Sequence, residues 1–164
     1  MKKPYRADKI PKLKIRGYRK SDNKDVWRLH ILGLEQFKSY LGGKWDKDLY
    51  TIEKIYLKNG SFIIGELSKK VIAMGAFKKI SDKKAEIKRV RVHPSYQKKG
   101  FEQAILEELE KRAAKLGYKI LQLDTTNKQI PAQKFFEKNG YTKTKTERLE
   151  KYGLDMIFYK KISE

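Results

Sequence analysis

The 164-residue sequence contains no cysteine and only two histidines, His30 and His93. The lack of cysteine excludes disulfides, a catalytic thiol and every metal site built on thiolates. With two histidines, a structural zinc site would take most of its ligands from carboxylates, which is uncommon. Neither histidine stands in a spacing typical of a triad or a metal site, so we expect no metal.

Long apolar runs are also missing. No stretch approaches the roughly 20 apolar residues of a membrane-spanning helix. The basic segment at residues 1–13 is not followed by the apolar core of a secretory signal. These absences predict a cytoplasmic protein with no membrane partner.

Positive charge is in large excess. Forty Lys and Arg residues against twenty Asp and Glu give a net charge of +20, which favours anionic partners. Only eight of the forty are arginine, the better reader of phosphate and guanine. Because the lysines are spread along the whole chain, a solvated surface is favoured over a nucleic-acid face. Nucleic-acid binding stays open, although no recognisable motif supports it.

The pattern of apolar and turn-forming residues predicts a basic leader at residues 1–13 and one domain at 14–164. The expected elements are a strand at 14–19, a helix capped by Ser21 or Asp22, a second helix ending at Asn59-Gly60, three strands at 61–67, 70–79 and 85–93, a helix at 101–116, a strand at 118–125, a helix at 131–139 and a hairpin of 141–151 with 154–162. An aromatic connection containing Phe37, Tyr40 and Trp45 joins the first two helices.

The clearest helix, at 101–116, lies between two strands. Its apolar stripe is Phe101, Ile105, Leu109, Ala113 and Leu116. A strand, a helix and a strand of these lengths form a βαβ crossover, so the strands at 85–93 and 118–125 should be parallel. The fold class is therefore α+β (an α/β mixed sheet): one domain with a central, mostly antiparallel sheet and about four helices.

The loop Gln97-Lys98-Lys99-Gly100 leads from a strand into this helix. A helix N-terminus presents unpaired N–H groups and a positive dipole end, both of which suit phosphate. A glycine there lets the backbone approach a ligand closely. On these residues alone, an anion site and an ordinary surface turn are equally consistent with the loop.

Together with the preceding Val92-His93-Pro94-x-Tyr96, the run Gln97-x-x-Gly100 resembles the signature of GNAT superfamily N-acetyltransferases, Gln/Arg-x-x-Gly-x-Gly/Ala. The resemblance extends over residues 14–162 and includes Phe135 and the Gly140-Tyr141 pair after the fourth helix. It implies a GNAT-like domain that uses acetyl-CoA as cosubstrate.

The resemblance also implies a set of cofactor-binding residues. The backbone groups of Val90 and Val92 would hold the pantetheine arm and help to stabilise an oxyanion. The diphosphate would be bound by Gln97, Lys98, Lys99, Gly100 and Phe101.

Three residues depart from the family pattern. Glu102 occupies the second Gly/Ala position of the signature, Phe136 stands where many members carry a tyrosine as general acid, and Gln129 aligns with a frequent asparagine. A thiolate with a pKa near 8.5 can leave without a dedicated acid. The phenylalanine therefore does not exclude catalysis.

By the same resemblance, the protein is an acyl-CoA-dependent N-acyltransferase that acetylates a primary amine by direct attack on the thioester. Glu86 is the candidate base for the ammonium proton; the alternative is a surface carboxylate paired with a neighbouring lysine. The net charge favours a small-molecule or protein acceptor that carries negative charge. A non-catalytic GNAT-fold module that binds acyl-CoA or an anionic partner is the alternative function. A homodimer is expected from the resemblance alone.

Overall fold

The computed structural model describes residues 12–37 and 43–163. Within these ranges the α-helices are α1 (Asn23–Phe37), α2 (Ile52–Tyr56), α3 (Phe101–Lys115) and α4 (Ile130–Lys138), and the strands are β1 (Lys14–Gly17), β2 (Ser61–Leu67), β3 (Lys70–Lys79), β4 (Lys84–Val92), β5 (Ile120–Thr126), β6 (Thr142–Leu149) and β7 (Leu154–Ile162). Short 3-10 segments are η2 (Lys20–Asp22), η3 (Gly43–Tyr50), η4 (Pro94–Tyr96) and η5 (Glu150–Tyr152). The predicted leader lies almost entirely outside the described residues.

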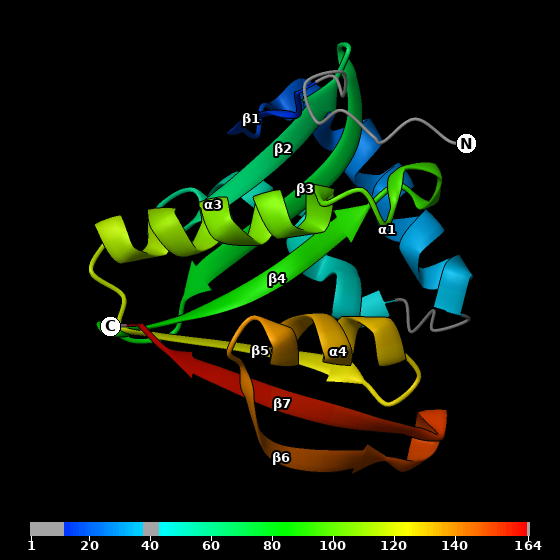
Figure 1. Ribbon diagram of the computed structural model, residues 1–164, viewed down its shortest axis with the longest axis vertical. Helices are drawn as coiled ribbons and strands as arrows, with labels where there is room; N and C mark the ends of the chain where they lie inside the picture. The colour runs from blue at the N-terminus through cyan, green and yellow to red at the C-terminus, as the bar shows by residue number, and fades with distance from the viewer. Residues whose placement is uncertain (1–11, 38–42, 164) are drawn as a thin grey trace, which may run out of the picture.

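The strands form one mixed sheet in the order β1-β2-β3-β4-β5-β7-β6 (Figure 1). The predicted meander is confirmed, because β2, β3 and β4 pair antiparallel in sequence order. The predicted parallel pairing of β4 with β5 is also confirmed. The final hairpin adds β7 to β5 and leaves β6 at the edge. The sequence therefore predicted the fold class, with strand ends displaced by a few residues.

Two apolar cores lie on opposite faces of the sheet. One contains α3, the buried side of β5 and Phe136 of α4, and Figure 1 shows α3 and α4 on the near side of the strands. The other contains residues of α1, α2 and η3 against β2 and β3. Gly75 of β3 lets α3 approach closely, since a Cβ there would lie 2.6 Å from Cγ2 of Ile105.

Two expectations about burial were wrong in part. Leu116, predicted as the end of the α3 stripe, follows the helix and is 56% exposed. The run Ile120-Leu121-Gln122-Leu123, largely apolar, predicts burial on both faces of the strand. In β5 only Leu121 and Leu123 of this run are buried, and the intervening side chains are partly exposed. Leu121 and Leu123 point into the core that contains α3, whereas the alternate side chains Ile120 and Gln122 lie on the other face of β5, which is covered only in part.

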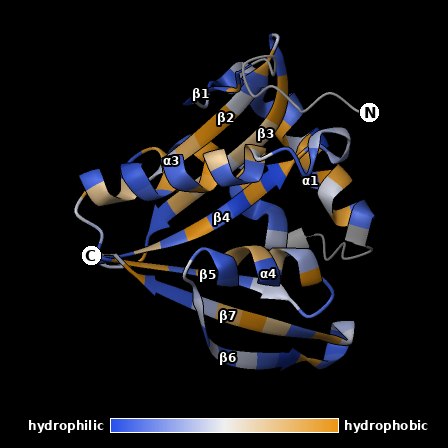
Figure 2. Ribbon diagram, in the orientation of Figure 1, coloured by the Kyte–Doolittle hydropathy of each residue, from blue (hydrophilic) through white to orange (hydrophobic). Residues whose placement is uncertain are grey.

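The sheet edge formed by β6 is polar. Seven of its eight residues are exposed, and Figure 2 shows hydrophilic residues along β6 where β2 and β3 are largely hydrophobic. Lysines on an edge strand disfavour pairing with another chain. No helix among the described residues has the length and apolar character needed to cross a membrane.

Candidate active site

The site begins where β4 and β5 separate. The two strands pair from Lys84 to Glu86 and from Ile120 to Gln122. Beyond these residues β5 continues along β7, and β4 has no partner on the β5 side in the described part of the chain. One extra residue bulges out of β4 opposite β3 between Lys88 and Arg91. The carboxyl halves of two parallel strands therefore diverge, a place where α/β sheets commonly bind ligands.

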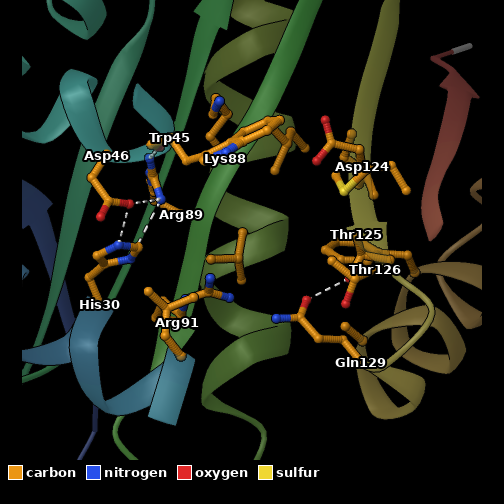
Figure 3. A pocket seen from close by; sticks show the side chains of 17 residues that line it. His30, Trp45, Asp46, Lys88, Arg89, Arg91, Asp124, Thr125, Thr126 and Gln129 are labelled. Atoms are coloured by element: carbon orange, nitrogen blue, oxygen red, sulfur yellow. Dashed lines mark hydrogen bonds and ion pairs between the residues drawn. The ribbon is translucent and has the colours of Figure 1, made fainter. Parts of the chain in front are cut away.

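Two adjoining cavities occupy this opening. The central cavity lies between β4 and β5 and is bordered by α1, η3 and α4 (Figure 3). The helix-end cavity lies between β4, the loop into α3, and α4. The residues that line both cavities are Val90, Arg91, Gln129, Ala132 and Phe136.

The structure brings four of the seven predicted cofactor residues to the helix-end cavity, namely Val90, Val92, Gln97 and Lys98. The Gln97 amide donates to the carbonyl of Val92 at 3.1 Å, which ties the loop to the strand. Lys99, Gly100 and Phe101 do not line it. The Phe101 side chain is instead 7% exposed in the core.

The start of α3 has the geometry that a phosphate needs. Lys98 and Gly100 have positive φ values of 61° and 86°, and no side chain caps the first turn. A Cβ at Gly100 would have no atom within 4 Å, so the approach to the turn is open. Free N–H groups at a helix N-terminus next to this opening fit the diphosphate of coenzyme A.

Glu102 and Arg91 place opposite charges in the helix-end cavity. Burial raises the pKa of Glu102, and the positive charge of Arg91 partly offsets this rise. Burial and the neighbouring Arg89 lower the pKa of Arg91 to about 10, so its guanidinium remains charged at neutral pH. Glu102, which replaces the Gly/Ala of the signature, therefore shares its cavity with a positive charge, that of Arg91 in β4.

A buried ionic network forms one wall of the central cavity. His30 of α1 and Asp46 of η3 are joined through Nε2 and Oδ1 at 2.7 Å. Arg89, in the β4 bulge, donates through Nε to Asp48 at 3.0 Å and through Nη2 to the carbonyl of Trp45 at 2.5 Å. The Asp48 carboxylate also accepts the hydroxyl of Tyr56. The network ties η3 to both α1 and the strand.

The pKa shifts in this wall follow from its pairing. Burial favours protonation of Asp48, but the hydrogen bonds and charge of Arg89 outweigh it, and the pKa of Asp48 is lowered. Burial lowers the pKa of His30, and Arg89 lowers it further. A neutral His30 whose Nε2–H donates to Asp46 therefore fits the site. Of the predicted aromatic residues, Trp45 lines the cavity, while the Phe37 side chain and Tyr40 lie outside the described parts.

Asp124 of β5 is a cavity residue that the sequence reasoning missed. It lines the central cavity and is exposed to it, and Figure 3 shows its carboxylate at the opening between β4 and β5. The protein atoms around the cavity partly shield the Asp124 carboxylate from water and so raise its pKa, and the negative charge of Glu86 raises it further. The signal in the sequence was weak: a carboxylate near the carboxyl end of the strand that follows a crossover, where α/β sheets commonly bind ligands.

Glu86, the predicted base, does not line either cavity. Its carboxylate lies 3.7 Å from Nζ of Lys78 and 3.8 Å from Nζ of Lys88. This pairing corresponds to the alternative considered for it, a carboxylate held by neighbouring lysines.

The start of α4 supplies the remaining wall. Gln129 is 8% exposed, and its Oε1 accepts the hydroxyl of Thr125 at 2.6 Å. Phe136 lines both cavities with an apolar ring and has no proton to donate. In residues 12–37 and 43–163 no cluster of three or more histidine, aspartate or glutamate side chains is suited to a metal ion.

Solved structures share this architecture. A GNAT-family acetyltransferase from Staphylococcus aureus Mu50 has a TM-score of 0.82 at 18% identity, with 93% of this chain and 100% of that chain covered. The PaiA N-acetyltransferase from Thermoplasma acidophilum in complex with coenzyme A has 0.71 at 20%, with 92% and 99% covered. A GNAT-family acetyltransferase from Elizabethkingia anophelis with acetyl-CoA bound has 0.67 at 18%, with 92% and 97% covered.

Among curated proteins, no relative matches the chain. The model of the acetyltransferase (GNAT) family matches residues 26–141, which include the β4 bulge, the loop into α3 and the start of α4. This chain therefore belongs to the GNAT acetyltransferase family.

Proposed function

We propose that this protein is a cytoplasmic N-acetyltransferase that transfers the acetyl group of acetyl-CoA to a primary amine by direct attack. The observation that carries the proposal is the pair of adjoining cavities at the separated ends of β4 and β5. One opens beside an uncapped helix N-terminus, and the other holds the carboxylate of Asp124. The family and the coenzyme A complexes of similar folds support it.

Acetyl-CoA supplies an activated acetyl group. A neutral amine attacks its carbonyl carbon, the carbon–sulfur bond breaks, and the proton lost by the acylated nitrogen goes to the departing thiolate. In this proposal the N–H groups at the start of α3 bind the diphosphate, with Lys98 adding charge. Backbone groups of Val90 and Val92, on the edge of β4 that its separation from β5 leaves open, hold the pantetheine arm. Lys99, Gly100 and Phe101 contribute backbone groups to the diphosphate site.

The ammonium proton passes to an oxygen of Asp124. Its raised pKa makes this carboxylate a stronger base than an ordinary aspartate. Glu86, the base expected from the sequence, acts on Asp124 through its charge, which favours the protonated form. Asp124 lines the central cavity and Glu86 does not, and this difference favours Asp124 as the base.

The acceptor in this proposal carries negative charge, because a protein of net charge +20 repels polycations. Rapid acetylation of spermidine with little salt dependence would contradict this part. The homodimer expected from the family resemblance stays a prediction.

The test compares wild type with Asp124→Asn. Calorimetric titration with acetyl-CoA measures binding, and thiol release with a panel of amines measures turnover. We expect kcat/KM to fall about 10²- to 10⁴-fold, the usual contribution of a general base, with acetyl-CoA binding unchanged. Asp82→Asn, at a side chain that is 91% exposed, is the matched control.

Two outcomes separate the alternatives. Acetyl-CoA binding by the wild type without turnover of any amine would favour a non-catalytic acyl-CoA-binding module. Absence of acetyl-CoA binding at moderate salt would overturn both functions and leave an anionic macromolecule as the partner to seek.

A further inference from the structure

An arginine whose buried Nε has no hydrogen-bond acceptor among the described residues lies where the two cavities meet. Arg91 lines both cavities, and its Nε is buried with no acceptor within hydrogen-bond distance. Its stem passes over Gly33 of α1, where a Cβ would lie 2.8 Å from Cδ of Arg91. A buried charged donor without a partner is costly. A cation kept in this state is prepared for an anion that the folded chain does not itself supply.

The charges around Arg91 leave it unneutralised. Among the described residues no carboxylate forms an ion pair with it, and Glu102 and Asp46 act on it only through space. Asp46 is engaged with His30 and lies 4.0 Å from Arg89. Arg89 repels Arg91 and is itself paired with Asp48. The contrast between the two arginines marks Arg91 as the one available to a ligand.

A second donor faces the same place. Because Oε1 of Gln129 accepts from Thr125, the amide nitrogen of Gln129 is turned the other way. In Figure 3 this nitrogen and the guanidinium of Arg91 point toward each other across the cavity. Gln129 is buried, and so is Thr126, which lines the central cavity and whose hydroxyl has no hydrogen-bond partner in the described part of the chain.

We propose that Arg91 and Gln129 bind a carboxylate group of a substrate at the junction of the two cavities. This inference rests on the proposed acetyl transfer and adds a substrate class to it. The planar fork of a guanidinium matches two carboxylate oxygens, and a side-chain amide adds one more donor. A guanidinium also pairs with two phosphate oxygens, but in the proposed function the phosphates of coenzyme A bind at the start of α3.

The carboxylate has two chemical sources, the acceptor and the acyl group. The central cavity favours the acceptor, because it holds Asp124 as well as Arg91. An amino-acid-like acceptor would place its ammonium group at Asp124 and its carboxylate at Arg91. An acyl chain that ends in a carboxylate, as in malonyl- or succinyl-CoA, would reach Arg91 from the helix-end cavity.

The experiment uses the full chain and separates these sources. In the acceptor arm, each common L-amino acid is compared with its C-terminal amide at saturating acetyl-CoA, by thiol release and product mass. At least one amino acid should exceed its amide by tenfold or more in kcat/KM. The ammonium group of the amide has the lower pKa, so at neutral pH more of the amide is present as the reactive neutral amine. This difference favours the amide and cannot by itself produce a preference for the amino acid.

In the acyl arm, calorimetry compares acetyl-, malonyl- and succinyl-CoA. A dissociation constant at least tenfold lower for a carboxylated thioester would assign the carboxylate to the acyl group. In either arm the preference should disappear in Arg91→Met, fall partly in Arg91→Lys, and persist in Arg19→Met, a control at a side chain that is 66% exposed.

A stability measurement keeps the test independent of turnover. Removing an unpartnered buried charge should raise the melting temperature of Arg91→Met without ligand, whereas loss of a structural contact would lower it. The proposal is overturned if acetyl-CoA binds but neither arm shows a preference, if the preference survives in Arg91→Met, or if that variant melts below wild type. Failure to bind any CoA thioester would instead refute the proposed function.

Discussion

Two groups of charged side chains border the central cavity, and they differ in how completely they are paired. On the wall formed by α1 and η3, Arg89 is shared between two aspartates and a carbonyl, and His30 is joined to Asp46. At the junction with the second cavity, Arg91 has a buried nitrogen for which residues 12–37 and 43–163 supply no acceptor. Asp124 lines the same cavity as Arg91 and forms no ion pair among the described residues.

Arg89 and Arg91 are the same residue type on the same strand, but their different pairing gives them different roles. A closed network stabilises a single arrangement of η3 and holds Arg89 in a left-handed conformation, with φ of 62°. Buried charges without a partner lower the stability of the protein without ligand, and only a bound ligand of opposite charge offsets this cost. We therefore interpret the wall as scaffold and the junction as the substrate-binding part.

The largest expected effect comes from opening the closed network. Arg89→Met would leave Asp46 and Asp48 buried without their cation. Breaking a buried ion pair in this way costs about 3–5 kcal/mol, which corresponds to roughly 10 °C in melting temperature. Calorimetric or circular-dichroism melting measures it. Arg28→Met, which removes a surface pair with Asp25, is the control and should cost at most about 1 kcal/mol. If both variants lost the same stability, the buried network would contribute no more than a surface ion pair.

Glu86→Gln sharpens the distinction between Glu86 and Asp124. The charge of Glu86 raises the pKa of Asp124, so its removal should lower that pKa. The acidic limb of the pH profile of kcat/KM would then move to lower pH. The plateau should stay within about threefold of wild type, because the general base is retained. A plateau reduced a hundredfold or more would restore Glu86 as the base.

His30 tests the wall through pH. In the folded protein its pKa lies below the ordinary 6.5 because of burial and Arg89. The unfolded chain takes up a proton near that pH while the folded chain does not, so stability declines as pH falls below about 6.5. Urea unfolding at about pH 8 and about pH 5.5 should show a smaller decline in His30→Gln than in wild type. His93→Gln is the comparison. Burial, Lys70 and Arg28 also lower the pKa of His93, but this histidine is more exposed than His30, so its replacement should reduce the decline less. An identical decline in both variants would contradict the assignment.

The smallest expected effect is that of Gly33→Ala. Alanine favours the helix by about 1 kcal/mol, but its Cβ would lie 2.8 Å from Cδ of Arg91 and displace that side chain. The arginine is flexible, so the melting temperature should change by only a few degrees. Any carboxylate preference should weaken. A more stable variant with an unchanged preference would show that Gly33 does not set the position of Arg91.

Sequence patterns determined the order of elements, the meander, the parallel crossover and the loop that opens α3. These features depend on local periodicity and on turn residues such as Gly100 and Gly117, which have positive φ values as expected for glycine. The family signature at Gln97 and Gly100 then located the cofactor side, and four of the seven predicted residues line the helix-end cavity.

Only the tertiary structure decided which charged residues belong to the site. Glu86 and Asp124 both lie on strands, but the cavity forms where β4 and β5 stop pairing, two residues before Asp124 in β5. Arg91 lies between Val90 and Val92, and the sequence predicted a role only for the backbone groups of these two valines. The bulge in β4 and the absence of a side chain at Gly33 place its guanidinium at the junction. Pairing between strands far apart in sequence leaves no local periodicity, and so these positions could be found only once the sheet was assembled.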